Sequence, residues 1–293
     1  MSESQSLLEA IGYRFQASTT TYGEKDAALY ALSIGASKDP LDGGDLQYTY
    51  ELSASGFYCF PTFAATFPLQ TMEQLASIPN QRLNLMEVLH GEHFLELYGP
   101  LPASGTITNQ AEISQVYDKG SGALIIVDIN STDQEGNLVA FNQASIFVRG
   151  RGGFGGDRGP SSRGDGPPQR TADELLGEKT AANQALLYRL TSGDRNPLHA
   201  DTRFAALLGY PQPILHGLCT YGYAARAVLK TFAGNNPERF KGMKARFSSH
   251  VFPGETIETE MWQESDSRIV FRSRVVERDE IVLTNGIVFL QAG

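Results

Sequence analysis

The sequence predicts an α+β fold in which one unit occurs twice, each unit being an antiparallel sheet wrapped around a helix. Two long stretches, residues 102–148 and 253–290, alternate apolar and polar side chains at a period of two, as half-buried strands do. A third stretch, residues 216–229, is apolar on nearly every side, which is typical of a buried helix.

The two strand-rich stretches break at corresponding places. The first has turn residues at 118–122 (DKGSG) and 133–137 (DQEGN), and the second has them at 264–267 (ESDS) and 277–280 (ERDE). Each stretch ends with an asparagine, a small residue and an apolar strand. We therefore predict an internal duplication, in which each copy ends in a meander of long antiparallel strands.

The two copies differ in their helices. The helix at 216–229 is long and apolar, whereas the first copy offers only residues 61–68, a short stretch bounded by prolines. A long antiparallel sheet around one helix is the hot-dog arrangement, so the sequence predicts a double hot-dog fold. The short helix of the first copy is expected to leave room beside its sheet.

One segment, residues 149–168, separates the copies and is rich in Gly, Arg, Asp and Pro. This composition predicts a linker between an N-terminal repeat (1–148) and a C-terminal repeat (169–293). The glycines do not indicate a nucleotide-binding P-loop, because no Lys-Ser/Thr pair follows them and no helix opens there.

The bulk composition excludes several classes of protein. The chain has 293 residues and a net charge of −9 with no basic run, which argues against nucleic acid as its main partner. No apolar stretch approaches the roughly 20 residues of a membrane span. Cys59 and Cys219 form no C-x-x-C pair, so neither a disulfide framework nor a metal site is predicted.

The most informative segment is YRLTSGDRNPLHADTRFA, which begins at Tyr188. It places a carboxylate (Asp194), an amide (Asn196) and an imidazole (His199) within six residues. Gly193 permits positive φ, and the proline after Asn196 favours extended backbone there, so the stretch is a shaped turn and not a helix face. Such a turn presents polar groups for acid/base chemistry, although a capped surface turn uses the same residue types.

This segment resembles the signature of the 2-enoyl-CoA hydratase 2 family, the MaoC-like (R)-specific hydratases. The pattern of that family requires an aromatic residue, an aliphatic residue, a small residue, Gly-Asp-x-Asn-Pro-aliphatic-His, and a small residue six positions on. Each position is filled here, by Tyr188, Leu190, Ser192, Gly193, Asp194, Asn196, Pro197, Leu198, His199 and Ala205. The resemblance extends over most of the chain and implies the same double hot-dog fold.

The resemblance implies hydration of a 2-enoyl thioester, in which a water held between Asp194 and His199 supplies both added groups. We expect Asp194 to deprotonate the water and His199 to manage the proton at C2, although the sequence does not fix these roles. Asn196 would orient the dyad or the water. Gly217, at the start of the buried helix, would present its N–H to the thioester oxygen, although close packing at a helix entry also requires glycine.

Coenzyme A enters as part of the substrate, and no separate cofactor is expected. The candidates for binding it are Arg195, Lys244 and Arg246, which would meet phosphate, and Phe247, which would stack. Each of these residues fits a solvated strand face nearly as well.

Three other histidines receive no catalytic role. His90 and His93 lie in a stretch that alternates like a strand and that corresponds to Lys244–Phe247, and the first copy has no Gly-Asp-x-Asn-Pro-x-His motif. One active site per chain is therefore expected. His216 is interpreted as a packing or hydrogen-bonding residue.

Three alternatives stay open: a 3-hydroxyacyl-thioester dehydratase of fatty acid synthesis, a hot-dog thioesterase, and a non-catalytic acyl-CoA-binding module. The dehydratase would use identical residues, because the reaction is reversible. The resemblance also implies a role in fatty acid β-oxidation, a homodimer and a peroxisomal location, and it implies that the first repeat accommodates a long acyl chain. The chain ends in Gln-Ala-Gly, which is not a peroxisomal targeting tripeptide.

Overall fold

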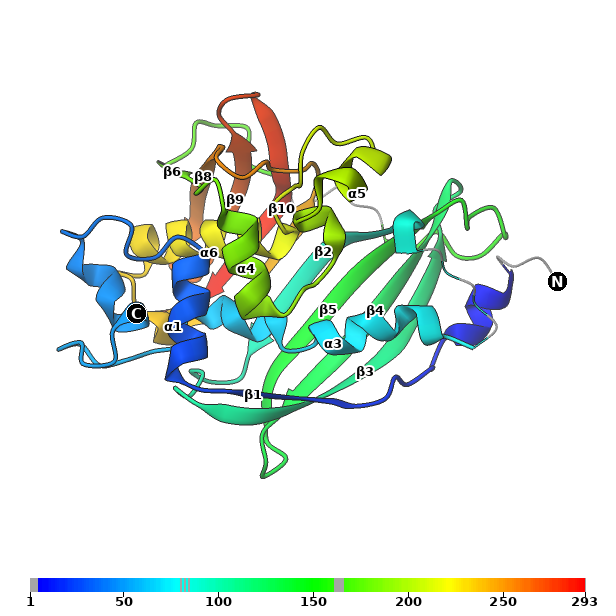
Figure 1. Cartoon of the computed structure of the whole chain (residues 1–293), viewed down its shortest axis with the longest axis horizontal. Coiled ribbons are helices and arrows are strands. Elements are labelled where there is room, and N and C mark those ends of the chain that lie inside the picture. Colours follow the sequence, from blue (N-terminus) through cyan, green and yellow to red (C-terminus); the bar gives the residue numbers. More distant parts are fainter. Residues whose placement is uncertain (1–4, 80, 82, 84, 161–165, 293) are drawn as a thin grey trace.

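The protein is described from a computed structural model that covers residues 5–79, 81, 83, 85–160 and 166–292. Ten antiparallel strands form one sheet in the order β1-β3-β4-β5-β2-β7-β10-β9-β8-β6. The helices α1, α3, α4 and α6 lie on one face of this curved sheet, and α6 runs across its second half (Figure 1).

The strands of the first half are β1 (Ser18–Tyr22), β2 (Val88–Leu97), β3 (Gly105–Asp118), β4 (Gly122–Thr132) and β5 (Leu138–Arg149). Those of the second half are β6 (Glu174–Lys179), β7 (Phe240–Phe247), β8 (Thr256–Ser265), β9 (Arg268–Val275) and β10 (Glu280–Leu290). The order β1-β3-β4-β5-β2 in one half is mirrored by β6-β8-β9-β10-β7 in the other.

The two halves meet edge to edge through β2 and β7. These strands pair antiparallel, with Glu92 opposite Arg246 and Phe94 opposite Lys244. The predicted double hot-dog fold is confirmed, and the two predicted sheets are halves of one continuous sheet. The expected correspondence between the strand containing His90 and the strand Lys244–Phe247 also agrees with their equivalent positions in the two halves.

The central helix of the second half is α6 (Gly217–Phe232), which extends three residues beyond the expected end at 229. Its residues from Leu218 to Leu229 are all buried, as the apolar pattern predicts. At the corresponding place, the described residues of the first half form a 3₁₀ turn at Pro61–Thr66 and the short helix α3 (Leu69–Met72), with Phe67 and Pro68 between them. The inequality of the two helices is therefore as predicted.

The remaining helices are α1 (Glu24–Ser33), α2 (Leu46–Thr49), α4 (Gln184–Ser192) and α5 (Thr202–Leu207). Further 3₁₀ turns occur at Gln5–Ala10, Gly43–Asp45, Glu73–Ser77, Leu85–Glu87, Pro197–His199 and Pro237–Arg239. The helices α1 and α4 follow the equivalent edge strands β1 and β6, and they lie side by side (Figure 1).

The segment after β5 is anchored through the carboxylate of Asp118, at the end of β3. This carboxylate accepts hydrogen bonds from the backbone N–H groups of Gly153, Gly120 and Gly155, each at 2.8 Å. The N–H groups of Gly153 and Gly120 are the largest contributors that lower the pKa of Asp118, to about 2. The backbone N–H groups of these glycines thus surround the Asp118 carboxylate of the first half. Residues 161–165 of the expected linker lie outside the described residues.

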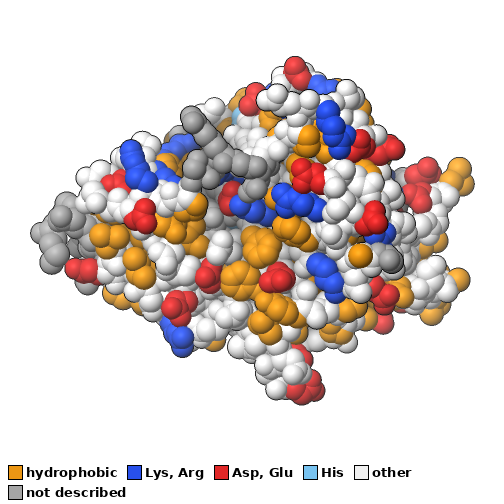
Figure 2. Space-filling view, turned by 180° about the vertical axis from the view of Figure 1, so that it is seen from behind, with side chains coloured by type: hydrophobic (Ala, Val, Ile, Leu, Met, Phe, Trp, Pro, Cys, Tyr) orange, Lys and Arg blue, Asp and Glu red, His pale blue; other side chains and the backbone are white. Residues whose placement is uncertain are grey.

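Within the described part of the chain, no helix combines the length and apolar character needed to cross a membrane. The face turned away from the viewer in Figure 1 carries acidic and basic side chains interspersed with apolar ones (Figure 2). Lys244 and Arg246 alternate along β7 with Met243 and Ala245, which are buried in the core.

Candidate active site

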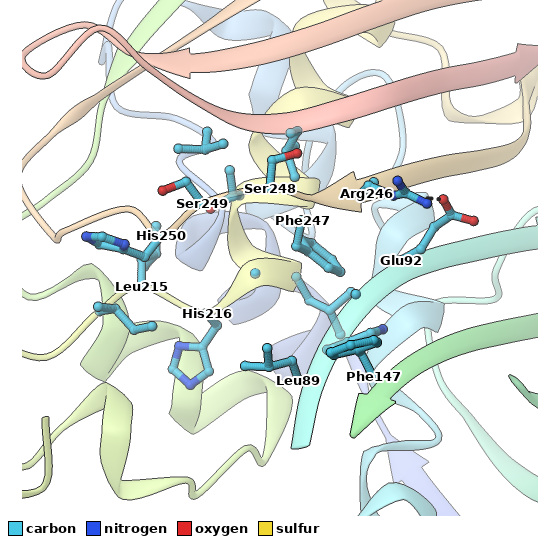
Figure 3. Close-up of a pocket in the computed structure, with 18 of the residues that line it drawn as sticks. Leu89, Glu92, Phe147, Leu215, His216, Arg246, Phe247, Ser248, Ser249 and His250 are labelled. Carbon is cyan, nitrogen blue, oxygen red and sulfur yellow. Dashed lines mark ion pairs between the residues drawn. The ribbon is translucent and has the colours of Figure 1, made fainter. Parts of the chain in front are cut away.

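A cavity of about 780 Å³ lies where the ends of β2, β5 and β7 meet the start of α6 and the polar turn after α4. Its lining includes Asp194, Asn196, His199, His216 and Gly217. In Figure 3, Leu89 and Phe147 approach from the strands of the first half, while Phe247 and His216 approach from the second. The site therefore draws on both repeats.

The polar turn is shaped by two successive side-chain-to-backbone hydrogen bonds. Gly193 ends α4 in the left-handed region (φ 77°). The Asp194 carboxylate then accepts the N–H of Asn196 at 3.0 Å, and the Asn196 side-chain oxygen accepts the N–H of Leu198 at 3.0 Å. Asn196 thus caps the 3₁₀ turn that carries His199 and fixes where the imidazole lies.

The tautomer of His199 follows from its surroundings. The side chain is 9% exposed, and its Nδ1 lies 2.9 Å from the carbonyl oxygen of Ile214. A carbonyl only accepts, so Nδ1 carries the proton and the neutral ring has an unprotonated Nε2. Burial lowers the pKa of His199, while Asp194 and the Ile214 carbonyl oppose this shift. His199 is therefore equipped to accept a proton at Nε2.

His216 lies directly against His199. The two imidazoles are stacked, with ring centroids 3.7 Å apart and an interplanar angle of 26°. Burial and the neighbouring His199 lower the pKa of His216, so this ring is neutral near pH 7. His216 carries no role in the site predicted from the sequence, in which its position directly before Gly217 is the one available signal.

Asp194, His199 and His216 form a compact cluster, in which one ligand-type atom from each residue lies within 4.8 Å of the other two. Two imidazoles and a carboxylate are a donor set that transition metals accept, so the residues present fit a metal ion by their chemistry. The same three groups suit proton transfer to and from a held water. The expectation of a metal-free site stays a prediction.

Gly217 is the first residue of α6, and His216 is its N-cap. Amide N–H groups at this position have no acceptor within the helix, and the helix dipole favours negative charge there. A Cβ added at Gly217 would lie 3.0 Å from two ring carbons of Phe247. Glycine is thus required for the approach of the Phe247 ring, and it leaves the amide open to a ligand.

The four residues predicted to bind coenzyme A fall into two groups. Arg246 and Phe247 line the cavity, whereas Arg195 and Lys244 lie outside its lining. Glu92 lies 3.6 Å from Arg246 and 3.3 Å from Lys244, and Figure 3 shows the Arg246–Glu92 pair pointing away from Phe247. Arg246 therefore lies at the rim of the cavity.

Basic residues of the first half, which sequence reasoning missed, also line the cavity. They are Lys119, in the turn between β3 and β4, and Arg149, at the end of β5. Burial, then Arg246 and Arg158, lowers the pKa of Lys119. Lys119, Arg149 and Arg246 thus gather positive charge beside the cavity, and only the folded sheet brings these residues together.

The first half also contributes apolar side chains to the lining. Leu69, Val88, Leu89, Leu124 and Phe147 reach the cavity from α3, β2, β4 and β5. His90 is one of the polar residues that the first half adds to the lining, with Glu92, Lys119, Ser145 and Arg149. Its Nε2 is buried without a hydrogen-bond partner among the described residues, and burial lowers the pKa of His90 to about 4.

Two family matches divide the chain at the Gly-rich segment. Residues 20–150 match the MFE-2 hydratase 2 N-terminal domain, and residues 165–286 match the MaoC like domain. The catalytic candidates fall in the second match, while Lys119 and the apolar lining from the first half fall in the first.

Relatives match nearly the whole chain. Peroxisomal multifunctional enzyme type 2 of Mus musculus is 44% identical over 286 residues, which is 96% of this chain and 38% of that protein. Probable enoyl-CoA hydratase 2 of Dictyostelium discoideum is 41% identical, with 91% of this chain and 90% of that protein covered. The crystal structure of a MaoC-like dehydratase from Phytophthora capsici superposes with a TM-score of 0.84 at 35% identity and covers 99% of each chain.

Proposed function

The chain belongs to the enoyl-CoA hydratase 2 family, and we propose that it adds water to trans-2-enoyl-CoA to give (3R)-3-hydroxyacyl-CoA in fatty acid β-oxidation. The observation that carries this proposal is the juxtaposition of Asp194 and His199 at a cavity beside the free N-terminus of α6. The chain spans 38% of the length of the mouse relative, so the other activities of that protein are not attributed to it.

The proton chemistry follows from the tautomer of His199. A water between the dyad donates one hydrogen bond to the Asp194 carboxylate and the other to Nε2 of His199. As the water oxygen attacks C3, Nε2 takes its proton and then delivers it to C2 on the same face of the substrate, so the addition is syn. Asp194 orients the water and stabilises the imidazolium. This assignment gives His199 the base role that the sequence analysis had given to Asp194.

The negative charge that builds on the thioester oxygen is met by the N–H of Gly217. A backbone donor at a helix N-terminus is held rigidly and needs no reorganisation during the reaction. Losing one such donor typically costs about 2.7–4 kcal/mol in the barrier. Asn196 acts indirectly, because its side chain shapes the turn that carries His199.

The two ends of the substrate are assigned to different parts of the cavity. The basic rim formed by Lys119, Arg149 and Arg246 suits the phosphates of coenzyme A, and Phe247 offers a ring beside it. Arg195 and Lys244 remain predicted contacts of coenzyme A. The apolar lining from the first half suits the acyl chain, in the space left by the short helix α3.

The nearest alternative is the reverse reaction. The Phytophthora capsici structure is named a dehydratase, and loss of water from a 3-hydroxyacyl thioester needs the same residues in reverse. The physiological direction therefore depends on the carrier and on the flux, not on the dyad. A thioesterase or a binding module would have no need for the Asp194 and His199 geometry.

The proposal is tested by adding a medium-chain trans-2-enoyl-CoA to the purified chain and following both enoyl absorbance and free thiol. We expect loss of the enoyl absorbance without thiol release, at a rate unchanged after dialysis against a chelator. Thiol release would indicate a thioesterase, absence of both signals would favour a binding module, and loss of activity on chelation would contradict a metal-free mechanism.

Compartment and assembly are further proposals. The mouse relative and enoyl-CoA hydratase 2 of Arabidopsis thaliana carry "peroxisomal" in their names, which supports a peroxisomal location for this chain. Co-localisation of a fluorescent fusion with a peroxisomal marker tests it. We propose a homodimer on family grounds, which light scattering of the purified protein tests.

A further inference from the structure

We propose that His216 is a positioning residue for the hydration step, which acts through His199 by presenting the flat face of its ring. The stack fixes the plane of the His199 imidazole and stabilises the imidazolium that forms when Nε2 takes the proton of the water. This inference rests on the proposed function, because it concerns the proton-accepting role of His199.

The geometry explains why His199 needs a second constraint. Its hydrogen bond to the Ile214 carbonyl, 2.9 Å long, fixes the tautomer but leaves the ring free to rock about that contact. A second ring at 3.7 Å and 26° closes one face of the imidazole and removes this freedom. Nε2 is then held toward the cavity and the water, and a proton acceptor held in this way reacts faster than a mobile one.

His216 is itself rigidly placed. It is the N-cap of α6, it is 2% exposed, and its ring contacts Tyr188 of α4 at a centroid distance of 5.0 Å. Neither ring nitrogen makes a hydrogen bond of ordinary geometry with the described residues. The backbone of Asp194 lies close enough to oppose the lowering of the His216 pKa, but the contact with His199 is made by the π face, so another flat ring should replace it there.

The electrostatic effect has a definite sign. A neutral aromatic face attracts a cation that lies over it, so His216 raises the pKa of His199 as long as His216 stays neutral. Burial keeps it neutral by lowering the pKa of His216. The charged or titratable groups facing this pair are Tyr188 and Arg189 from α4 and Asp194 from the turn, and all three are retained in the variants below.

The test compares His216→Leu, which has no flat face, with His216→Phe, which keeps one. We expect His216→Leu to lower kcat about 10–100-fold with little change in KM, and to shift the acid limb of the kcat/KM profile down by about 0.5–1 pH unit. His216→Phe should keep kcat within about fivefold of the wild type, and the acid limb of its kcat/KM profile should lie at the same pH as that of the wild type. Equal losses in the two variants would overturn the proposal.

A double-variant cycle separates positioning from a general structural role. If His216 acts through His199, then His216→Leu causes no further loss in a His199→Ala background. An equal further loss in that background would overturn the proposal. Hydration by the wild type in the same assay tests the proposed function by itself. Failure of the proposed function is therefore distinguishable from failure of the role proposed for His216.

An NMR titration of the His199 imidazole keeps the proposal testable without an activity measurement. In the wild type and in His216→Phe, we expect the same pKa for His199 and one dominant tautomer with the proton on Nδ1. A mixture of tautomers in the wild type, or a pKa changed by His216→Phe as much as by His216→Leu, would contradict it.

Discussion

One hydrogen bond, from Nδ1 of His199 to the carbonyl of Ile214, decides which nitrogen faces the cavity. It leaves Nε2 unprotonated beside the Asp194 carboxylate, and it makes the imidazole the proton acceptor. The motif predicted both residues, because Asp194, Asn196 and His199 lie within six positions and the turn fixes them locally. The motif did not predict the tautomer, because Ile214 lies on a different segment of the chain.

The requirement for a carboxylate is tested by Asp194→Asn. An amide oxygen can still accept the N–H of Asn196, so the turn is retained, but the charge that stabilises the imidazolium is lost. We expect the hydration rate to fall about 10²–10⁴-fold. The matched control is Asp133→Asn, a half-buried aspartate outside the cavity whose carboxylate likewise accepts a backbone N–H two residues on, from Glu135 at 3.0 Å. Normal turnover by the Asp194 variant would disprove the assignment.

The approach to the Gly217 amide is tested by Gly217→Ala. The added methyl would press on the Phe247 ring at 3.0 Å and displace the donor or the thioester. We expect kcat/KM to fall about 10²-fold, with the protein still folded. The control is Gly177→Ala in β6, where the nearest atom to an added Cβ is 3.9 Å away. Full activity in the Gly217 variant would assign this glycine to packing alone.

The residues that sequence reasoning missed share one property: each belongs to the site through tertiary structure. Lys119 and Arg149 come from strand ends of the first half, and His216 becomes significant only when its ring meets His199. No local pattern marks such residues, because the pairing of β2 with β7 brings Lys119 and Arg149 to the site, and the packing of the start of α6 beside the polar turn brings His216 to His199.

At the scale of elements, α6 is held by an ionic cluster at its centre. Arg226 is 2% exposed, and it forms ion pairs with Asp45 and Glu178, both at 2.8 Å. Lys230, one turn further along, pairs with Asp42 at 2.7 Å. The apolar pattern predicted a buried helix, but not a buried arginine within it, since its partners lie far away in the sequence.

Substitution of Arg226 by methionine tests this cluster. The change leaves Asp45 buried without its main counter-charge, and such a loss costs about 3–5 kcal/mol of unfolding free energy. The control is Arg14→Met, which removes an exposed ion pair with Glu112 and should cost about 0–1 kcal/mol. Urea unfolding measures the unfolding free energy of both variants. Equal losses of unfolding free energy would mean that the buried ion pairs stabilise the protein no more than the exposed pair does.

At the scale of the whole molecule, the two halves of the chain contribute different parts of the site. The second half carries Asp194 and His199, and the first half supplies apolar lining and part of the basic rim. The internal repetition and the unequal helices were readable from period-two alternation and from the prolines. The joining of the halves through β2 and β7 was not readable, because strand alternation does not specify which edges pair.

The seam between the halves buries histidines, and this predicts sensitivity to acid. Burial lowers the pKa of His90 to about 4 and that of His93 to about 3, and it also lowers the pKa of His199 and His216. Between about pH 6.5 and pH 4 the unfolded chain therefore binds more protons than the folded one, so stability falls as the pH falls.

The expected slope is about 1.4 kcal/mol per pH unit for each such histidine. Urea unfolding across this range measures it, and His93→Gln should give a shallower curve, because it removes one titrating group. An unfolding free energy that stays constant from about pH 6.5 to pH 4.5 would contradict the assignment of these histidines as buried and neutral.

The most direct test of the central claim is the configuration of the product. The purified chain is incubated with a trans-2-enoyl-CoA, and the 3-hydroxyacyl-CoA formed is resolved by chiral chromatography, with Asp194→Asn as the parallel control. Water held on one face by Asp194 and His199 predicts a single enantiomer from the wild type and almost no product from the variant, and membership of the enoyl-CoA hydratase 2 family predicts that this enantiomer is (3R)-3-hydroxyacyl-CoA. A (3S) or racemic product, or the same yield from the variant, would contradict the account.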